Sequence, residues 1–522
     1  MRARLPEISR SVAVAATAIG VLAAPAAAQA TRAQPGPPRF AVTYDPALTP
    51  SYSGRVYVML SALAAGEPRF GPSWFATEPF YAIDVVDWKP EAPLVIDDAA
   101  LGFPGRLSEI EAGTYTIQAV MRRNPDSPTI GRGPGTAYSP TLQKHVDSNA
   151  GEIALRIDRF VDATPFRETD RIKLVELDSA LLQEFHGRRI TMRAAVILPP
   201  GYGSEDDPGI RYPALYWIGG FGSTHRSAGG LSGMWDATGH ADRIVRVVLD
   251  PSCYSGHHVF ADSDNNGPRG TALVTELIPH LERHFRLVAA PTARFLSGHS
   301  SGGWSSLWLG VTYPDFFGGV WSLAPDPVDF RDFQRIDLYE PGANMFTDPQ
   351  GNRRPVARSG EEPVVFYEPF TRMELVYGDG GQLRSFDWVF SPRGAEGRPL
   401  RLYDPETGDV NGLVARAWKR YDIRLILQRQ WPTLGPKLKG KLSIFAGELD
   451  TFYLEGAVAK LQTTLQELGA DATIEIFPGA NHGSFYTPQL RARIDTELLA
   501  IFDRHHRGTS TRPRQRQEAS TP

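Results

Sequence analysis

The sequence is poor in cysteine and has no strong excess of either charge. Cys253 is the only cysteine among 522 residues, so the chain can form neither an internal disulfide nor a cysteine-based zinc site. The 55 Lys and Arg residues nearly balance the 59 Asp and Glu residues, and the formal net charge is −4. A chain this close to neutral gives no support for a nucleic-acid or polyanion binder.

Long apolar runs are missing after the first thirty residues. Three arginines in the first ten residues precede an uncharged, alanine-rich stretch from Ser11 to Ala28. This pattern, with an A-x-A end, is typical of a signal peptide cut after Ala30. The alternative is an uncleaved membrane anchor, which the alanine content and Pro25 disfavour. We therefore expect residues 1–30 to be removed and a periplasmic or secreted protein without a membrane span.

The composition is that of a large soluble protein. Hydrophobic residues make up 42% and charged residues 22% of the chain. The 50 glycines and 43 prolines are about 18% of the chain, above the usual ~12%, which predicts many turns and loops. A length of 522 residues exceeds one ordinary domain.

The region 31–162 carries a β pattern. Its extended runs are short, rich in β-branched and aromatic residues, and separated by Gly, Pro, Asp and Asn: Gly54–Ser61, Phe80–Val86 and Gly113–Met121. In the last run, apolar and polar residues alternate, as in a half-buried strand. No long helical pattern interrupts the region, and we predict an all-β sandwich domain.

The region 163–507 alternates strand and helix patterns, which predicts an α/β domain with a mostly parallel sheet. The predicted strands are Arg189–Leu198, Ala214–Ile218, Ile244–Leu249, Arg294–Ser297, Gly319–Leu323, Leu442–Ala446 and Thr473–Phe477, and the predicted helices include Thr271–Phe285, Leu454–Leu468 and Gln489–Phe502. Residues 327–440 interrupt the alternation and are predicted to be a lid-like insertion. Residues 508–522 are predicted to be a disordered basic tail.

The strongest chemical signal is a G-x-S-x-G motif formed by Gly298, Ser300 and Gly302. An apolar strand pattern leads into it and a helical pattern, Trp304–Tyr313, leads out. This strand–turn–helix context is that of a nucleophile elbow, where glycines relieve a sharp turn and the helix N-terminus favours developing negative charge. Ser300 is therefore the predicted nucleophile, and a glycine-rich structural turn is the alternative.

A nucleophilic serine needs a base and an acid that orients it, in the chain order Ser, Asp or Glu, His. Asp450 and His482 follow the ends of two predicted strands, where such a sheet places its active site. Asp450 is the predicted acid and His482 the predicted base, with Glu448 as the competing acid. Six further histidines are predicted to be structural: His225, His257, His258, His299, His505 and His506. The side chain of His299 is expected to point away from Ser300.

An oxyanion hole is predicted from two backbone N–H groups. One belongs to Ser301, directly after the nucleophile, and the other to Phe221 in the glycine-rich turn 219–222, with Gly220 or Gly222 as alternatives. The side chains of Phe221 and Trp304 suggest an acyl or aryl binding wall but could equally belong to the core. We assign Trp304 to substrate binding.

No metal or cofactor is expected. Residues 262–267 match the start of a calcium loop, but Leu273 occupies the position that requires a bidentate Glu. Since the segment leads directly into a helix pattern, its polar groups are predicted to cap that helix.

From about Ala195 to Tyr486 the chain resembles the esterase D-like, or putative esterase, branch of the α/β-hydrolase superfamily. The resemblance rests on YWIGGFGST, GHSSGG, AGELD and PGANHGSFY in this order, with ADSDNNG and YPDFFGGVWSLAPD between them. It implies acyl transfer through a serine ester, with Ser300, Asp450, His482 and the N–H groups of Phe221 and Ser301 in the matching roles. A β-sandwich before such a domain is similar to the arrangement in enterochelin esterases.

These patterns together predict an exported serine esterase that hydrolyses a small-molecule carboxylic ester through an acyl-enzyme and needs no cofactor. An acyltransferase or a serine peptidase on the same fold is an alternative, as is a non-catalytic binding protein. The sequence identifies neither the substrate nor the oligomeric state.

Overall fold

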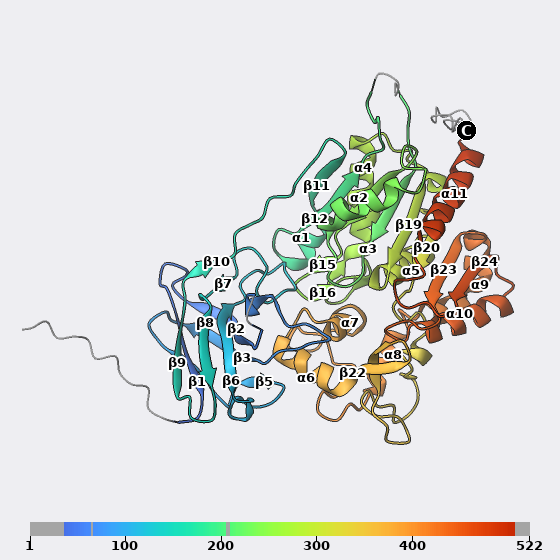
Figure 1. Cartoon of the computed structure of the whole chain (residues 1–522). Coiled ribbons are helices and arrows are strands. Elements are labelled where there is room, and N and C mark those ends of the chain that lie inside the picture. Colours follow the sequence, from blue (N-terminus) through green and yellow to red (C-terminus); the bar gives the residue numbers. More distant parts are fainter. Residues whose placement is uncertain (1–35, 64–65, 205–208, 507–522) are drawn as a thin grey trace, which may run out of the picture.

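The computed structural model describes residues 36–63, 66–204 and 209–506 (Figure 1). The predicted signal peptide 1–30 and the predicted tail 508–522 lie outside the described residues.

The N-terminal part consists of two β-sheets that share one hydrophobic core. The smaller sheet has the order β4-β1-β9, and the larger has the order β10-β7-β6-β2-β3-β5, with β8 paired to β6. Buried side chains from both sheets meet in this core, among them Phe40, Val58 and Ile117. The strands are β1 (Arg39–Tyr44), β2 (Tyr52–Ser61), β3 (Phe80–Trp88), β4 (Leu94–Ile96), β5 (Leu101–Phe103), β6 (Gly113–Met121), β7 (Ala137–Tyr138), β8 (Leu142–Val146), β9 (Glu152–Ile157) and β10 (Arg159–Phe160), with single turns η1 (Pro68–Phe70) and η2 (Leu107–Glu109).

The second part is built on an eight-stranded sheet with the order β11-β12-β14-β13-β19-β20-β23-β24. The pairs β11–β12 and β12–β14 are antiparallel and the remaining pairs are parallel. The strands are β11 (Ile172–Asp178), β12 (Thr191–Ile197), β13 (Ala214–Ile218), β14 (Val245–Leu249), β19 (Arg294–His299), β20 (Gly319–Leu323), β23 (Leu442–Gly447) and β24 (Ala472–Phe477). The prediction of an α/β part is confirmed, and each predicted strand is present within one to two residues. β11 was not predicted, because this edge strand is charged and only partly buried.

Helices cover both faces of this sheet. Residues of α2 (Ala228–Asp236) and α11 (Pro488–His505) pack on one face. The other face is covered by α4 (Ile278–His284), α5 (Ser301–Thr312), α9 (Ile423–Leu438) and α10 (Glu455–Glu467). Shorter elements are α1 (Ala180–His186), η3 (His225–Ser227), α3 (Arg269–Ala272), the π-turn η4 (Leu273–Leu277), η5 (Pro291–Ala293) and the two-residue strands β15 (Ser252–Cys253), β16 (Gly256–His257), β17 (Asp262–Ser263) and β18 (Gly267–Pro268).

The segment 327–440 contains regular structure throughout. It holds η6 (Phe330–Asp332), the hairpin β21 (Pro355–Ser359) and β22 (Glu362–Phe366), then α6 (Tyr367–Tyr377), α7 (Gln382–Phe390) and α8 (Gly412–Trp418), and it ends with α9. Because α9 packs beside α5 and α10, the last part of this segment belongs to the helix layer of the sheet. The remainder forms a separate group around α6, α7 and α8 (Figure 1).

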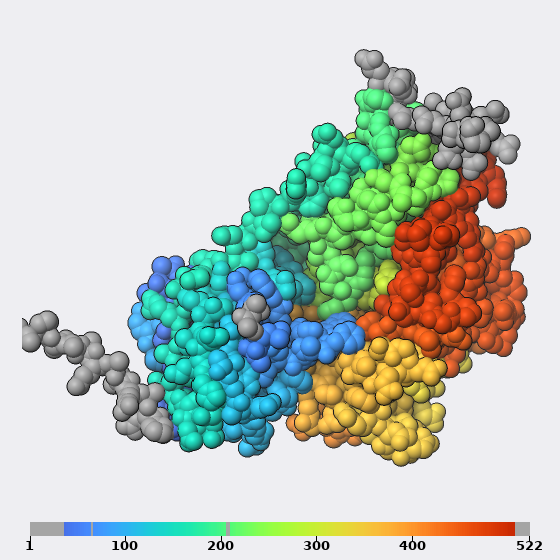
Figure 2. Space-filling view, viewed as in Figure 1, coloured from blue at the N-terminus to red at the C-terminus, as the bar shows by residue number. Residues whose placement is uncertain are grey.

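The N-terminal sheets pack against this group. Tyr57 Oη donates to the carbonyl oxygen of Tyr377 at 2.7 Å, and Arg55 donates to those of Leu375 and Val376. The guanidinium of Arg122 donates to the carbonyl oxygens of Asp379 and Tyr254. Figure 2 shows the blue N-terminal surface reaching across to the yellow and orange parts of the chain. The two parts are therefore joined by a polar and partly buried interface beside the carboxyl end of the sheet.

Candidate active site

Ser300 occupies a sharp turn between β19 and α5. Its backbone has φ +60° and ψ −124°, a strained conformation for a residue other than glycine. The turn leaves no space at Gly302, where an added Cβ would lie 1.9 Å from the carbonyl oxygen of Ile218. The backbone N–H of Ser300 donates to the carbonyl oxygen of Leu323 at 2.9 Å. These contacts hold Ser300 at the N-terminus of α5, as the sequence motif predicted.

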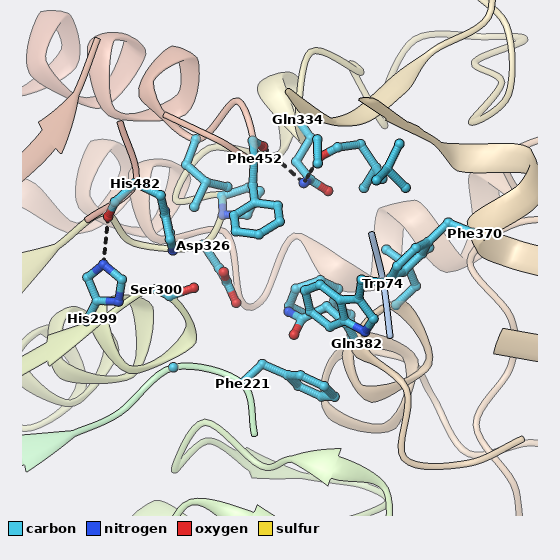
Figure 3. A pocket seen from close by; sticks show the side chains of 18 of the residues that line it. Trp74, Phe221, His299, Ser300, Asp326, Gln334, Phe370, Gln382, Phe452 and His482 are labelled. Atoms are coloured by element: carbon cyan, nitrogen blue, oxygen red, sulfur yellow. Dashed lines mark hydrogen bonds between the residues drawn. The ribbon is translucent and has the colours of Figure 1, made fainter. Parts of the chain in front are cut away.

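His482 and Asp450 come together beside Ser300. Nδ1 of His482 lies 2.7 Å from Oδ2 of Asp450, whose side chain is fully buried. The other oxygen of Asp450 accepts from the N–H of Phe452 at 2.8 Å. Since an ionised carboxylate only accepts, Nδ1 carries the proton, and Nε2 of the neutral ring is left as an acceptor. Ser300 and His482 line the same cavity (Figure 3).

Glu448, the competing acid, is placed differently. It is exposed, and its Oε2 accepts from the backbone N–H of Gly479 at 2.8 Å. Its side chain thus fixes the turn before His482 and has no contact with the imidazole. The geometry favours Asp450 as the partner of His482.

Two backbone N–H groups beside Ser300 are free to bind a ligand oxygen. Within the described ranges, neither Phe221 nor Ser301 donates its N–H to an acceptor of the protein. The turn that carries Phe221 lies against the serine, because a Cβ added at Gly220 would be 3.0 Å from Cβ of Ser300. The arrangement is that expected of an oxyanion hole.

Buried histidines support these loops. The N–H of Val259 donates to Nδ1 of His257 at 2.9 Å, so the proton is on Nε2, which donates to the carbonyl oxygen of Gly219 at 3.1 Å. His225 donates from Nδ1 to Oδ2 of Asp250 at 2.6 Å. His258 is also buried, and its Nδ1 accepts from the N–H of Phe260 at 3.1 Å. These three histidines fix local backbone and do not line the cavity that contains Ser300.

His299 does not point away from the site, and that prediction was wrong. His299 is among the residues that line the cavity, and its ring lies 4.5 Å from the ring of His482. Nε2 of His299 donates to the backbone carbonyl of His482 at 2.7 Å (Figure 3). Burial lowers the pKa of His299 to about 4, so this ring is neutral and acts as a fixed donor. The sharp turn at Ser300 brings its neighbour into contact with the loop of the base.

The cavity at Ser300 has a volume of about 300 Å³, and aromatic and aliphatic side chains make up most of its wall. Trp74 and Phe75, on the loop between β2 and β3, enter it from the N-terminal part. The ring centroid of Trp74 lies 5.5 Å from that of Phe221, 5.4 Å from that of Phe370 and 6.0 Å from that of Phe452. Figure 3 shows Trp74 opposite Ser300. The N-terminal part thus completes the cavity, which sequence reasoning missed.

Trp304 does not reach this cavity, and its assignment to substrate binding was wrong. It is 1% exposed, and its ring stacks on Trp308 with centroids 5.2 Å apart and contacts Phe390 at 5.1 Å. The side chain of Trp304, in the first turn of α5, packs into the aromatic core between α5 and the segment 327–440. Phe221, in contrast, lines the cavity with its side chain.

Asp326 and Gln382 also line the cavity and were not predicted. Asp326 follows the end of β20, is 6% exposed, and accepts from Oγ of Ser301 at 2.6 Å. Burial raises the pKa of the Asp326 carboxyl to about 6, and hydrogen bonds from Ser301 and Gln382 offset part of that effect. The rule that selected Asp450, an acid just beyond a strand end, would also have selected Asp326.

A comparison with protein-family models supports ester hydrolysis. The family described as "Putative esterase" matches residues 187–386, which include Phe221, Ser300 and Ser301. The protein is a carboxylic ester hydrolase. The matched region of this esterase ends before Asp450 and His482, whose roles rest on the geometry above. No curated protein matches the chain.

Several solved structures are similar to the esterase at low identity. A ferulic acid esterase is 14% identical with a TM-score of 0.40, covering 64% of this chain and 98% of its own. The fluorophosphonate-binding serine hydrolase F of Staphylococcus aureus is 14% identical with a TM-score of 0.39, covering 63% and 98%. An S-formylglutathione hydrolase from Agrobacterium tumefaciens is 15% identical with a TM-score of 0.38, covering 63% and 95%. No assignment below rests on these likenesses.

The described part of the esterase has neither a three-residue metal-binding cluster nor a helix that could span a membrane. Within residues 36–63, 66–204 and 209–506, no group of three or more His, Cys, Asp or Glu side chains could hold a metal ion. Asp262, from the tested calcium motif, accepts from the N–H groups of Gly270 and Thr271 at 2.7 and 2.9 Å and caps α3, as predicted. No helix in the described part of the chain is long and apolar enough to cross a membrane.

Proposed function

We propose that the chain is an exported serine esterase in which Ser300 is the nucleophile, His482 the base and Asp450 the orienting acid. The observation that carries the proposal is the 2.7 Å contact from Nδ1 of His482 to Asp450, made beside a serine held at φ +60° on the same cavity. Export is supported by the signal-peptide pattern of residues 1–30.

The first half-reaction forms an acyl-enzyme. Oγ of Ser300 attacks the ester carbonyl while its proton passes to Nε2 of His482. The oxyanion accepts hydrogen bonds from the N–H groups of Phe221 and Ser301, which have no other acceptor in the described structure. As the carbonyl re-forms, the bond to the alcohol oxygen breaks, and His482 returns its proton to that oxygen.

The second half-reaction repeats these steps with water. His482 takes a proton from water, whose oxygen attacks the acyl carbon, and the bond to Oγ of Ser300 breaks. Ser300 regains its proton from His482, and a carboxylic acid is released. Asp450 stays ionised throughout and stabilises the imidazolium that forms in each half.

The substrate is a small-molecule ester with an apolar or aromatic group. The walls of the 300 Å³ cavity include Trp74, Phe221, Phe370 and Phe452, which suits a flat or branched apolar group near the scissile bond.

Turnover of p-nitrophenyl esters of increasing acyl length tests the function. We expect hydrolysis by the mature protein and a loss of at least about 10⁴-fold in kcat for Ser300→Ala. Ser148→Ala, an exposed serine between β8 and β9, is the matched control and should leave kcat unchanged. Equal activity of both variants would overturn the role of Ser300. Adding an alcohol acceptor and measuring free acid against new ester separates hydrolysis from acyl transfer.

A further inference from the structure

The cavity at Ser300 contains a single formal charge, and it is negative. Of the twenty residues that line it, Asp326 alone is an Asp, Glu, Lys or Arg. Asp326 is 6% exposed, and the ion pairs among the described residues do not include it, although the imidazole of His482 is close enough to lower the pKa of its carboxyl. Buried carboxylates are nearly always paired with a cation. An unpaired one facing a cavity is therefore a feature that the fold alone does not explain.

The groups around Asp326 leave acceptors beside the cavity without a full set of donors. Ser301 uses its only hydroxyl proton to donate to Oδ2 of Asp326 at 2.6 Å. Nε2 of Gln382 contacts Oγ of Ser301 at 3.4 Å, and Oε1 of Gln382 is buried without a hydrogen-bond partner among the described residues. Figure 3 shows the Asp326 carboxylate between Ser300 and Gln382. A ligand that fills this space must bring positive charge or hydrogen-bond donors.

Aromatic side chains form a large part of the cavity wall, beside aliphatic ones such as Val356 and Leu383. Trp74 lies opposite Ser300 and packs against Phe221, Phe370 and Phe452. Aromatic faces attract cations, and the attraction grows when water is excluded. A carboxylate and aromatic rings that line one cavity are a combination that recognises an organic ammonium group, whereas a neutral hydroxyl would leave the buried charge uncompensated.

We propose that Asp326, with Gln382 and the aromatic walls, forms a subsite for a positively charged amine on the substrate. The proposal rests on the proposed function of the same site and names its substrate class: esters whose acyl or alcohol part carries an ammonium group close to the scissile bond. Esters with a carboxylate at that position are rejected, because two negative charges would share a desolvated cavity. Asp326 is a specificity-determining residue and takes no part in proton transfer.

The test measures binding separately from turnover. Benzylammonium, benzyl alcohol and benzoate have similar size and differ in charge. Each would be added to the full protein at about pH 7.5, and its dissociation constant taken from how far it slows labelling of Ser300 by a fluorophosphonate probe. We expect benzylammonium to bind at least about tenfold more tightly than benzyl alcohol, and benzoate to bind most weakly.

Two amide variants identify the source of the preference. Asp326→Asn keeps an acceptor for Ser301 but removes the charge, and it should bind benzylammonium and benzyl alcohol equally while still being labelled at Ser300. Glu362→Gln makes the same chemical change at an exposed position on β22 and should keep the full preference. Gln382→Leu should weaken benzylammonium binding by a few-fold.

The binding and labelling results test the amine subsite and the serine esterase separately. Equal binding of the three compounds to the parent protein, or an unchanged preference in Asp326→Asn, overturns the amine subsite while labelling of Ser300 still supports the serine esterase. Absence of labelling on Ser300 in the parent overturns the proposed function. In that case direct calorimetric titration with benzylammonium still decides whether Asp326 binds an amine.

Discussion

Asp326 should lower the stability of the folded protein at neutral pH, and replacing it with Asn should remove that cost. Burial raises the pKa of the Asp326 carboxyl from 3.8 to about 6. The folded state therefore holds this proton more tightly than the unfolded chain. The resulting stabilisation is complete below pH 3.8 and is lost as the pH rises through about 6. The shift corresponds to about 3 kcal/mol between the two limits.

The assay is urea unfolding of the parent and of Asp326→Asn at about pH 4 and about pH 8, followed by fluorescence. The free energy of unfolding of the variant, relative to the parent, should rise by about 2–3 kcal/mol between the two pH values. Taking the difference between the two pH values cancels any change in packing at the substituted site. Glu362→Gln controls for the loss of an exposed charge and should show no such rise. A pH-independent difference for Asp326→Asn would refute a buried, unpaired carboxylate at this position.

Three further predictions concern activity. Asp450→Asn should lower kcat by about 10⁴-fold with little change in KM, because the imidazole loses its orientation; steady-state kinetics measure this, and a loss of activity in Glu448→Gln instead would contradict it. Trp74→Ala should raise KM about tenfold for aryl esters but not for acetate esters, and equal effects on both classes would argue against a role of this ring in the cavity. Gly220→Ala should lower kcat about tenfold or more, since the added Cβ would lie 3.0 Å from Cβ of Ser300 and 3.3 Å from the carbonyl oxygen of His299. An unchanged kcat would show that the backbone of this turn can shift without displacing Ser300.

The sheet that carries the site could be predicted because its strands are short, apolar and bounded by glycine, proline or charged residues. Ala214–Ile218 and Gly319–Leu323 have the predicted bounds. These strands are buried on both faces, so burial alone explains their sequence. β11 escaped prediction because it lies at the sheet edge, where charged residues are tolerated.

The site residues that follow strand ends could be predicted, since their position depends on the sheet alone. Ser300, Asp450 and His482 are placed together by the parallel order of β19, β20, β23 and β24. The direction of a side chain on a helix or in a turn could not be predicted, because it does not follow from the order of the strands. Trp304 was correctly placed on α5, but the helix pattern does not tell which buried face meets the cavity.

Trp74 could not have been predicted from the sequence. It lies in a loop of the N-terminal part, more than 200 residues before Ser300, and it reaches the cavity only because of how the two parts pack. That packing depends on contacts between distant segments, such as Tyr57 with the backbone of Tyr377. No local pattern of charge or hydrophobicity encodes such a contact.

The central claim is that Ser300 is the nucleophile, and mass spectrometry of the protein after reaction with a fluorophosphonate tests it most directly. We expect one modification per chain, located on Ser300 in the peptide that contains GHSSGG, complete loss of ester turnover on labelling, and no modification of Ser300→Ala. Modification of another residue, or continued ester hydrolysis by fully labelled protein, would contradict the account.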